Sequence, residues 1–197
     1  MHELENDWEQ VRVWRNQRRH GLLAHRTGVD PKQRQALGRA ILERLVAMIH
    51  AEAYPRLGFY WPIRGEIDAR ELARLHIAAG GQAALPVIVT KHAPVEFWNW
   101  HPGIPTVRGV LDIPVPRERH LVIPDVLVVP LIGFDRAQFR LGYGGGYYDR
   151  TLAAMNPRPL TIGIAAAEAQ LETIYPQPHD IPMDVIVTEQ FVLGSVR

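Results

Sequence analysis

The sequence contains no cysteine and only one serine. Without cysteine the chain cannot form disulfides, thiolate zinc sites or a cysteine nucleophile. The one serine, Ser195, lies near the C-terminus without the flanking glycines of a nucleophile elbow, which argues against a serine-hydrolase triad. The histidines have no metal-ligand spacing, so we expect no transition metal.

Long apolar runs are also missing from the sequence. Residues 1–20 contain no apolar core of signal-peptide length, and no later stretch approaches the roughly 18–20 apolar residues of a membrane helix. We therefore expect a soluble, cytoplasmic protein with no membrane partner, and the absence of cysteine fits a reducing compartment. At 197 residues, one domain with its own hydrophobic core is the simplest organisation.

Lysine is nearly absent, because only Lys32 and Lys91 are lysines among the 22 basic residues. A bound phosphate would have to be held by guanidinium groups and backbone amides. The net charge is only +1 and no exposed aromatic residues interleave with the basic ones, so nucleic-acid binding is not expected. At about 100° per residue, four arginines share one side of the first predicted helix. This stripe, either a ligand contact or a plain solvated face, consists of Arg12, Arg15, Arg19 and Arg26.

The rest of the sequence alternates between helical and strand-like segments. Apolar spacing and capping residues predict helices over 3–24, 30–49, 68–79 and 147–155, with Asp30 and Pro31 starting the second and Asp68 and Glu71 in capping-box spacing at the third. Short apolar runs predict strands over 57–61, 82–89, 94–100, 125–134, 159–166 and 184–193, with a proline-punctuated loop over 101–124. This order predicts an α/β fold, a three-layer sandwich around a mainly parallel sheet.

Residues 140–150, RLGYGGGYYDR, lie between the most apolar predicted strand and the last predicted helix. The stretch is not a P-loop, because Tyr147 and Tyr148 follow the glycines where a lysine and a hydroxyl residue would be needed. It is not a dinucleotide fingerprint either, since the position of the third glycine falls on Tyr147 or Asp149. The glycines need another explanation.

A glycine loop before a helix suits an anion, because free backbone N–H groups and the helix dipole favour negative charge. Arg140 and Arg150 can contact phosphate oxygens. Asp149 would lie in the first helical turn, where a Mg²⁺ ion bridging it to the phosphates would relieve their repulsion. The alternative is a tight turn whose glycines only permit positive φ, with Asp149 as a helix-dipole residue.

The stretch FDRAQFRLGYGGGYYDRTL closely resembles the signature of the 5-formyltetrahydrofolate cyclo-ligases, also called methenyltetrahydrofolate synthetases. Further matches follow in the family's order: the arginine-rich first helix, RGEID, LPV followed by Phe97, PDVLVVP and HDIPMDVIVTE. The resemblance implies that 5-formyltetrahydrofolate is closed to 5,10-methenyltetrahydrofolate with ATP as co-substrate and Mg²⁺ as cofactor. In the implied mechanism the formyl oxygen attacks the γ-phosphate, N10 attacks the resulting imidate phosphate, and phosphate leaves.

The resemblance also implies a role for each matching residue. Those that would bind ATP are Arg15, Arg19, Arg140, Leu141, Gly142, Tyr143, Gly144, Gly145, Gly146, Tyr147 and Tyr148. Arg140 and Tyr147 would be catalytic, and Asp149 and Asp184 would hold Mg²⁺. Glu66 would accept hydrogen bonds from the N–H groups of the pterin, Trp61 would line the same pocket, and Phe97 and Trp98 would pack against the folate ring system.

Each of these assignments has a structural alternative. Glu66 could serve the start of the helix that follows it, and Asp184 could be a turn carboxylate. Trp61, Phe97 and Trp98 could be core residues.

Three positions depart from the family pattern. No lysine precedes the pair Trp14–Arg15 in the first helix, Gln138 replaces a glycine, and Asp112 lies where GVLDIP differs from the family's Gly-x-x-Glu-Pro. Two other functions therefore stay open. One is a paralogue on the same scaffold that binds ATP and another pterin or heterocycle, and the other is a non-catalytic folate- or nucleotide-binding regulator. The sequence does not indicate an oligomeric state.

Overall fold

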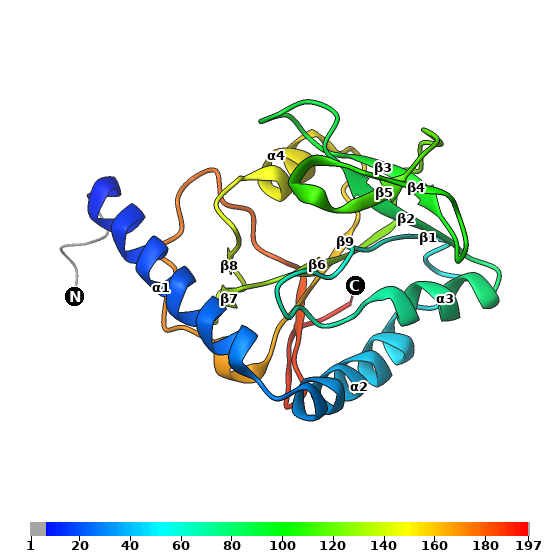
Figure 1. The fold of residues 1–197 in the computed structure, drawn as a ribbon. Coiled ribbons are helices and arrows are strands. Elements are labelled where there is room, and N and C mark those ends of the chain that lie inside the picture. Colours follow the sequence, from blue (N-terminus) through cyan, green and yellow to red (C-terminus); the bar gives the residue numbers. More distant parts are fainter. Residues whose placement is uncertain (1–6, 197) are drawn as a thin grey trace.

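The computed structural model describes residues 7–196 (Figure 1). Seven strands form one sheet in the order β11-β10-β9-β6-β1-β2-β3. Their bounds are β1 Arg56–Gly58, β2 Gln82–Val87, β3 Glu96–Trp100, β6 Val126–Pro130, β9 Leu160–Ile164, β10 Val185–Val187 and β11 Val192–Gly194. The strands from β10 to β2 are parallel to their neighbours, whereas β11 and β3 pair antiparallel at the two edges. The predicted α/β fold with a mainly parallel sheet is confirmed.

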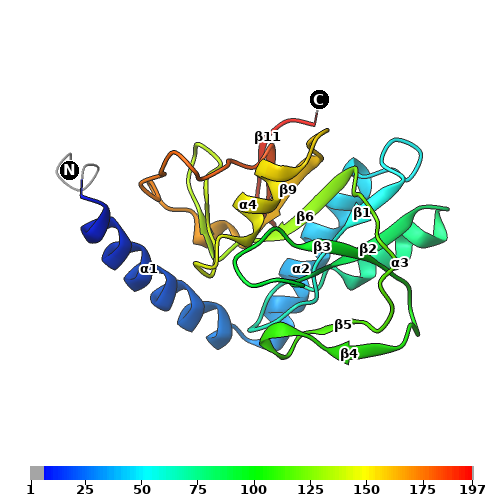
Figure 2. The same ribbon diagram turned by 90° about the horizontal axis from the view of Figure 1, so that it is seen from above.

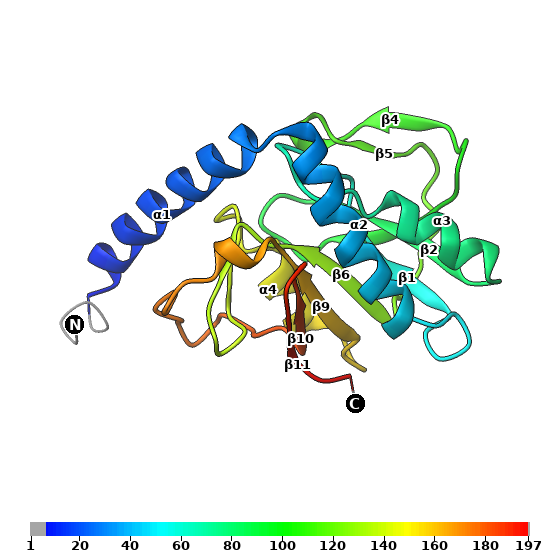
Figure 3. The ribbon, with the colours of Figure 1, turned by 90° about the horizontal axis from the view of Figure 1, so that it is seen from below.

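Helices lie on both faces of the sheet and give three layers (Figures 1 and 3). On one face lie α2 (Pro31–Met48) and α3 (Arg70–Ala78), and on the other lies α4 (Tyr147–Ala154). In β6, Val126 and Val128 belong to the hydrophobic cluster that includes α2 and α3, whereas Leu127 and Val129 belong to the cluster that includes α4. Because side chains alternate along a strand, a central strand between two helical layers is apolar at every position.

The first helix, α1 (Trp8–Gly28), extends along one side of the molecule and away from the sheet (Figure 2). Asp7 caps it by accepting hydrogen bonds from the backbone N–H groups of Glu9 and Gln10. The helix was predicted to begin at residue 3, which lies outside the described residues. Within α1 only Val11 and Arg15 are buried, so a narrow stripe attaches this helix to the protein. No helix among residues 7–196 is both long and apolar enough to cross a membrane.

The starts of α2 and α3 differ in how well the sequence predicts them. Asp30 accepts hydrogen bonds from the backbone N–H groups of Lys32 and Gln33, and Pro31 is the first helical residue, as predicted. The capping box at α3 is wrong, because the residue before that helix is Ala69 and no side chain caps it. Asp68 instead accepts hydrogen bonds from the backbone and guanidinium of Arg70.

Three segments differ from the predicted pattern of strands and loops. Residues 101–124 are not all loop, since β4 (Thr106–Arg108) and β5 (Pro114–Pro116) form an antiparallel hairpin there. After β6, the strands β7 (Gly133–Phe134) and β8 (Arg140–Leu141) form a small hairpin, which separates the central strand from the glycine loop. Residues 184–193 form β10, a turn and β11 rather than one strand.

The turn between β10 and β11 explains why the prediction of one strand over residues 184–193 was wrong. The Thr188 hydroxyl accepts hydrogen bonds from the backbone N–H groups of Gln190 and Phe191, which reverses the chain. Apolar residues continue on both sides of this turn, so a pattern of apolar residues alone cannot locate it.

Candidate active site

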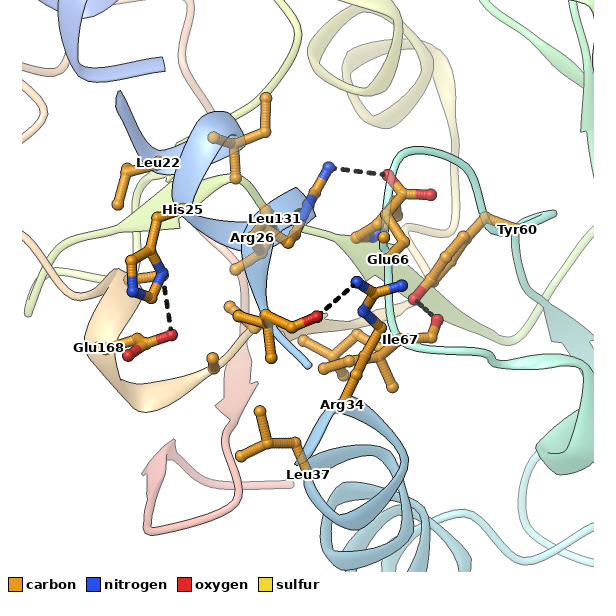
Figure 4. Close-up of a pocket in the computed structure, with 18 residues that line it drawn as sticks. Leu22, His25, Arg26, Arg34, Leu37, Tyr60, Glu66, Ile67, Leu131 and Glu168 are labelled. Atoms are coloured by element: carbon orange, nitrogen blue, oxygen red, sulfur yellow. Dashed lines mark hydrogen bonds and ion pairs between the residues drawn. The ribbon is translucent and has the colours of Figure 1, made fainter. Parts of the chain in front are cut away.

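A pocket lies beyond the carboxyl ends of β1, β6 and β9 (Figure 4). From β1 the chain crosses to β2 on one side and later returns to β6 on the other, so the carboxyl end of β1 is a topological switch point. Ligands of open α/β sheets bind at such points. The cavity has a volume of about 50 Å³, and its lining includes Arg26, Tyr60, Glu66, Leu131, Ala165 and Glu168.

Glu66 lies in the turn that follows β1, at the wall of this pocket. Its Oε2 accepts a hydrogen bond from the backbone N–H of Ile63 at 2.8 Å, and its Oε1 accepts one from the Tyr143 hydroxyl at 2.9 Å. The side chain is only 2% exposed, and Arg26 Nη2 lies 3.9 Å from Oε1. Because α3 begins only at Arg70, Glu66 does not serve the helix start.

The electrostatics of Glu66 reflect both its burial and its partners. Burial raises the pKa of Glu66 above its ordinary value, while the hydrogen bonds from Ile63 and Tyr143 and the charges of Arg26 and Arg64 act to lower it. The carboxylate is therefore held in place by donors but costly to ionise without them. A ligand that presents N–H groups could bind it strongly.

Tyr143 connects the glycine loop to Glu66. Its hydroxyl donates to Glu66 and accepts a hydrogen bond from Arg26 Nη2 at 2.5 Å. The guanidinium carbons of Arg26 and Arg64 lie 5.8 and 5.7 Å from the centroid of its ring. Burial and the neighbouring charge of Glu66 raise the pKa of Tyr143 to about 12, so the hydroxyl remains a donor at neutral pH.

The glycine loop runs from β8 into α4. Gly144 has φ +88° and Gly146, just before α4, has φ +62°, so these two positions need glycine for the turn itself. Gly142 has no such need, since its φ is not positive and a Cβ there would meet no atom within 4 Å. The tight-turn explanation therefore covers only part of the loop. Arg19 of α1 holds the loop by donating from Nε to the Gly142 carbonyl at 2.6 Å.

Arg140 and Asp149 form an ion pair beneath the loop. Arg140 Nη2 is 2.6 Å from Asp149 Oδ1, and the two side chains are 6% and 20% exposed. Arg140 Nη1 also donates to the Ile181 carbonyl at 2.6 Å, and the Ile181 N–H donates to Asp149 Oδ1 at 3.0 Å. The pair thus ties the first turn of α4 to the segment before β10.

Tyr147 and Tyr148 begin α4 and face different surroundings. Tyr148 packs inward against the cluster that includes Leu152, and its burial raises the pKa of its hydroxyl well above the ordinary value. Tyr147 is partly exposed, and the Arg150 guanidinium carbon lies 5.2 Å from its ring centroid. Leu141, which precedes the loop, is buried.

Asp184, the second predicted metal ligand, lies beside β9. Its Oδ2 accepts hydrogen bonds from the backbone and hydroxyl of Thr161 at 2.8 and 2.7 Å, and Arg158 lies 3.4 Å from its Oδ1. Asp149 and Asp184 therefore have different partners. Within the part of the chain that the structure describes, no three acidic or histidine side chains gather as a metal cage.

The arginine stripe of α1 faces the protein along most of its length. Arg15 donates to the carbonyls of Ile174 and Tyr175 and forms an ion pair with Asp180 at 2.6 Å. Arg19 holds the glycine loop and Arg26 reaches Glu66, so only Arg12 of the stripe is a solvated surface arginine. The plain solvated face is therefore the wrong interpretation for three of the four.

The aromatic residues assigned to the folate pocket lie elsewhere. Trp61 packs at the edge of the core with the Arg70 guanidinium carbon 4.9 Å from its ring centroid. Trp98 on the edge strand β3 donates from Nε1 to Glu96 at 2.8 Å, and Phe97 is buried in the core. Neither Trp61 nor Trp98 is among the residues that line the described pocket.

Sequence reasoning missed several residues of the pocket (Figure 4). Tyr60 is buried with its hydroxyl donating to the Ile67 carbonyl, and His25 Nδ1 lies 3.2 Å from Glu168 Oε1 at another wall. The signal for Tyr60 was its place at the carboxyl end of a predicted central strand. Nothing local in the sequence brings His25 near Glu168.

The divergent positions take distinct conformations. Gln138, at the family's glycine position, has φ +68°, a left-handed conformation. With its amide nitrogen facing the chain, it donates to the carbonyl of Asp184 at 2.8 Å. Asp112, φ +59°, lies in the β4–β5 hairpin and pairs with Arg108 at 3.5 Å on the surface. In the first helix no lysine precedes the pair Trp14–Arg15, and the Arg15 side chain forms an ion pair with Asp180.

Comparison with known proteins gives a consistent result. The model of the 5-formyltetrahydrofolate cyclo-ligase family matches residues 11–189. The 5-formyltetrahydrofolate cyclo-ligase of Escherichia coli (strain K12) is 31% identical over 170 residues, which cover 83% of this chain and 93% of the relative. That of Haemophilus influenzae is 28% identical over 171 residues, which cover 82% of this chain and 91% of the relative.

A solved structure agrees with the sequence relatives. The NMR structure of Aquifex aeolicus 5,10-methenyltetrahydrofolate synthetase superposes with a TM-score of 0.79 at 27% identity, covering 91% of this chain and 92% of that one. The family model spans both the glycine loop and the turn that carries Glu66. The chain belongs to the 5-formyltetrahydrofolate cyclo-ligase family of ATP-dependent ligases.

Proposed function

We propose that this protein closes 5-formyltetrahydrofolate to 5,10-methenyltetrahydrofolate with ATP and Mg²⁺, in the cytoplasm. The observation that carries the proposal is the hydrogen bond between Tyr143 of the glycine loop and Glu66 of the pocket. It brings a loop suited to phosphates within reach of a buried carboxylate suited to a pterin. Family membership supports the same activity over the paralogue and the regulator.

The nucleotide binds at the glycine loop and the start of α4. The backbone N–H groups of residues 142–146 and the helix dipole attract the phosphates, and Gly142 leaves room for close approach. Arg19 lies over the loop and can add charge to the phosphates. Tyr147, partly exposed at the helix start, contacts the nucleotide beside them.

The folate binds at the switch point with its pterin against Glu66. The carboxylate accepts hydrogen bonds from the amino and ring N–H groups of the pterin, and this fixes the orientation of the formyl group toward the loop. Trp61 and Trp98 remain candidates for contacts with the rest of the ligand, outside the pocket itself.

Asp149 is the better candidate of the two metal ligands. Among residues 7–196, the hydrogen bond to Asp149 and its shortest ion-pair contact both fall on Oδ1, whereas both oxygens of Asp184 have partners. Hard carboxylate oxygens fit Mg²⁺, which is usually held by one or two carboxylates together with substrate phosphates and water. When bound, the ion neutralises charge on the phosphates. Arg140 orients Asp149 for this task.

The chain needs no nucleophile of its own for this chemistry. The formyl oxygen attacks the γ-phosphorus of ATP, the bond to the bridging oxygen breaks and ADP leaves; N10 then attacks the activated carbon, loses its proton, and inorganic phosphate departs. Phosphoryl transfer depends mainly on positioning and charge neutralisation, which backbone amides, arginines and Glu66 provide. The lack of cysteine and of a suitably placed serine is therefore no obstacle.

The proposal is tested by incubating the purified protein with 5-formyltetrahydrofolate, ATP and Mg²⁺ and following the absorbance of the methenyl product. We expect product that depends on both ATP and the protein. Omission of ATP and substitution of another reduced folate are the controls. Calorimetry distinguishes the alternatives: ATP binding without product would favour the paralogue, and folate binding without turnover would favour the regulator.

A further inference from the structure

We infer that Tyr143 is a positioning residue that competes with the folate for Glu66, so that nucleotide binding at the glycine loop strengthens folate binding. This inference rests on the proposed function and deepens it. It assigns to one side chain the link between the two substrate sites.

Both carboxylate oxygens of Glu66 already accept a hydrogen bond. Oε2 is bonded to a backbone N–H, that of Ile63, which cannot leave without unfolding the turn. Oε1 is bonded to the Tyr143 hydroxyl, and Arg26 is 3.9 Å away. Each carboxylate oxygen has a second lone pair, but the Glu66 side chain is only 2% exposed, so a pterin N–H group reaches Oε1 only when Tyr143, the partner on the loop, moves aside.

Tyr143 can move, whereas the Ile63 N–H is fixed in its turn. Tyr143 lies between two glycines, Gly142 and Gly144, whose backbone has wide conformational freedom, and its residue is 38% exposed. Its ring lies near the guanidinium groups of Arg26 and Arg64, which can move with the ring or take its place beside Glu66. Tyr143 therefore acts as a stand-in for the N–H donor of the ligand.

The nucleotide acts on the same loop that carries Tyr143. Arg19 bonds the Gly142 carbonyl, one residue before Tyr143. When phosphates take up the N–H groups of the loop and attract Arg19, the backbone on both sides of Tyr143 changes its partners. Withdrawal of the hydroxyl frees Oε1, and the small cavity gains an unoccupied acceptor. Folate binding in turn favours the loop conformation that binds nucleotide, because coupling is reciprocal.

The experiment measures the dissociation constant of 5-formyltetrahydrofolate by calorimetry, with and without Mg²⁺ and a non-hydrolysable ATP analogue. In the unchanged protein we expect the analogue to tighten folate binding by about tenfold, since one hydrogen bond to a charged group corresponds to about that factor. In Tyr143→Phe we expect folate to bind about tenfold more tightly without the analogue, and the analogue to add little. The reciprocal titration must give the same factor.

Tyr54→Phe is the matched control. Tyr54 precedes the amino end of β1, whereas the pocket lies beyond the carboxyl ends of the strands. The Tyr54→Phe variant should therefore leave the coupling unchanged. Equal coupling in Tyr143→Phe and the unchanged protein would overturn the inference, as would the absence of coupling in the unchanged protein. If the protein turns over the folate but the coupling does not depend on Tyr143, only this inference fails. If it neither binds nor turns over the folate, the proposed function fails with it.

Discussion

Arg15 of α1 and Asp180 of the segment before β10 form an ion pair of 2.6 Å whose side chains are only 10% and 12% exposed. The Arg15 guanidinium also donates to the carbonyls of Ile174 and Tyr175. Because α1 has few buried residues, this pair is the main attachment of the middle of the helix. It keeps Arg19 over the glycine loop and Arg26 beside Glu66.

Loss of this pair should destabilise the protein. We expect Arg15→Ala to lower the free energy of unfolding by about 3 kcal/mol, because the buried charge of Asp180 would lose its ion-pair partner and keep the hydrogen bond from the Gln177 N–H. Arg12→Ala, which removes an exposed arginine of the same stripe, should change it by less than about 0.5 kcal/mol. Urea unfolding measures both variants. Equal stability of the two would mean that α1 is held by other contacts.

Gly142→Ala separates phosphate binding from turn geometry. Its φ is not positive and a Cβ would meet no atom within 4 Å, so the fold should not change. If the loop amides approach phosphates, the added methyl group should weaken ATP binding by about tenfold or more. Calorimetry with ATP provides the measurement, and Gly21→Ala in α1, where a Cβ also meets no atom, is the control. Unchanged ATP affinity would remove Gly142 from the nucleotide site.

Asp149→Asn tests the metal assignment. We expect a higher Mg²⁺ concentration for half-maximal turnover, because a charged ligand oxygen is lost. The variant also leaves Arg140 without its ion-pair partner, so the free energy of unfolding should fall as well. Asp125→Asn breaks another ion pair, with Arg56, at the amino end of β6 and should leave the Mg²⁺ dependence unchanged. A loss of stability without any change in Mg²⁺ dependence would limit Asp149 to bracing Arg140.

Glu66→Gln should show how much the ionised, buried carboxylate lowers the free energy of unfolding. Burial raises the pKa of Glu66, so its protonated form is favoured by folding and the ionised form is disfavoured. Below its ordinary pKa of 4.5, the unchanged protein and the variant should be similarly stable. As pH rises above that value and through the raised pKa, the unchanged protein should lose stability relative to the variant. Urea unfolding over a range of pH measures the difference, which should be absent or reversed if Arg26 and Tyr143 outweigh burial.

The same variant should lose its affinity for the folate. A neutral amide cannot reproduce the charged acceptor for pterin N–H groups, so the KM for folate should rise while ATP binding stays the same. A change in ATP affinity without a change in the KM for folate would refute the assignment of Glu66.

Replacing Gln138 by glycine should give a more stable protein than replacing it by alanine. Its φ of +68° costs an L-residue about 1–2 kcal/mol, which glycine does not incur. Both Gln138→Gly and Gln138→Ala lose the side-chain hydrogen bond to Asp184, so their difference isolates the backbone. We expect the glycine variant to be more stable than the alanine variant by about 1 kcal/mol in urea unfolding. If alanine were equally stable, the left-handed conformation would not be strained.

The core sheet and the start of α2 were predictable because their signals are local. Buried central strands are continuously apolar, and Asp30 and Pro31 act on the first turn of their own helix. The turn at Thr188 and the hairpin of β7 and β8 were missed because apolar residues lie on both sides of each turn, so the apolar pattern alone does not show where the chain reverses. The capping box at Asp68 failed because the side chain found a closer partner in Arg70.

By itself the sequence determined the class of fold, the family and the glycine loop, since each depends on residues close together along the chain. Only the tertiary structure decided what these residues contact. Tyr143 meets Glu66 across 77 positions and Arg15 meets Asp180 across 165, because the order of strands in the sheet and the docking of α1 bring them together. The loop was expected to hold the phosphates of ATP, and the packing of the folded chain also directs Tyr143 toward the buried carboxylate of Glu66.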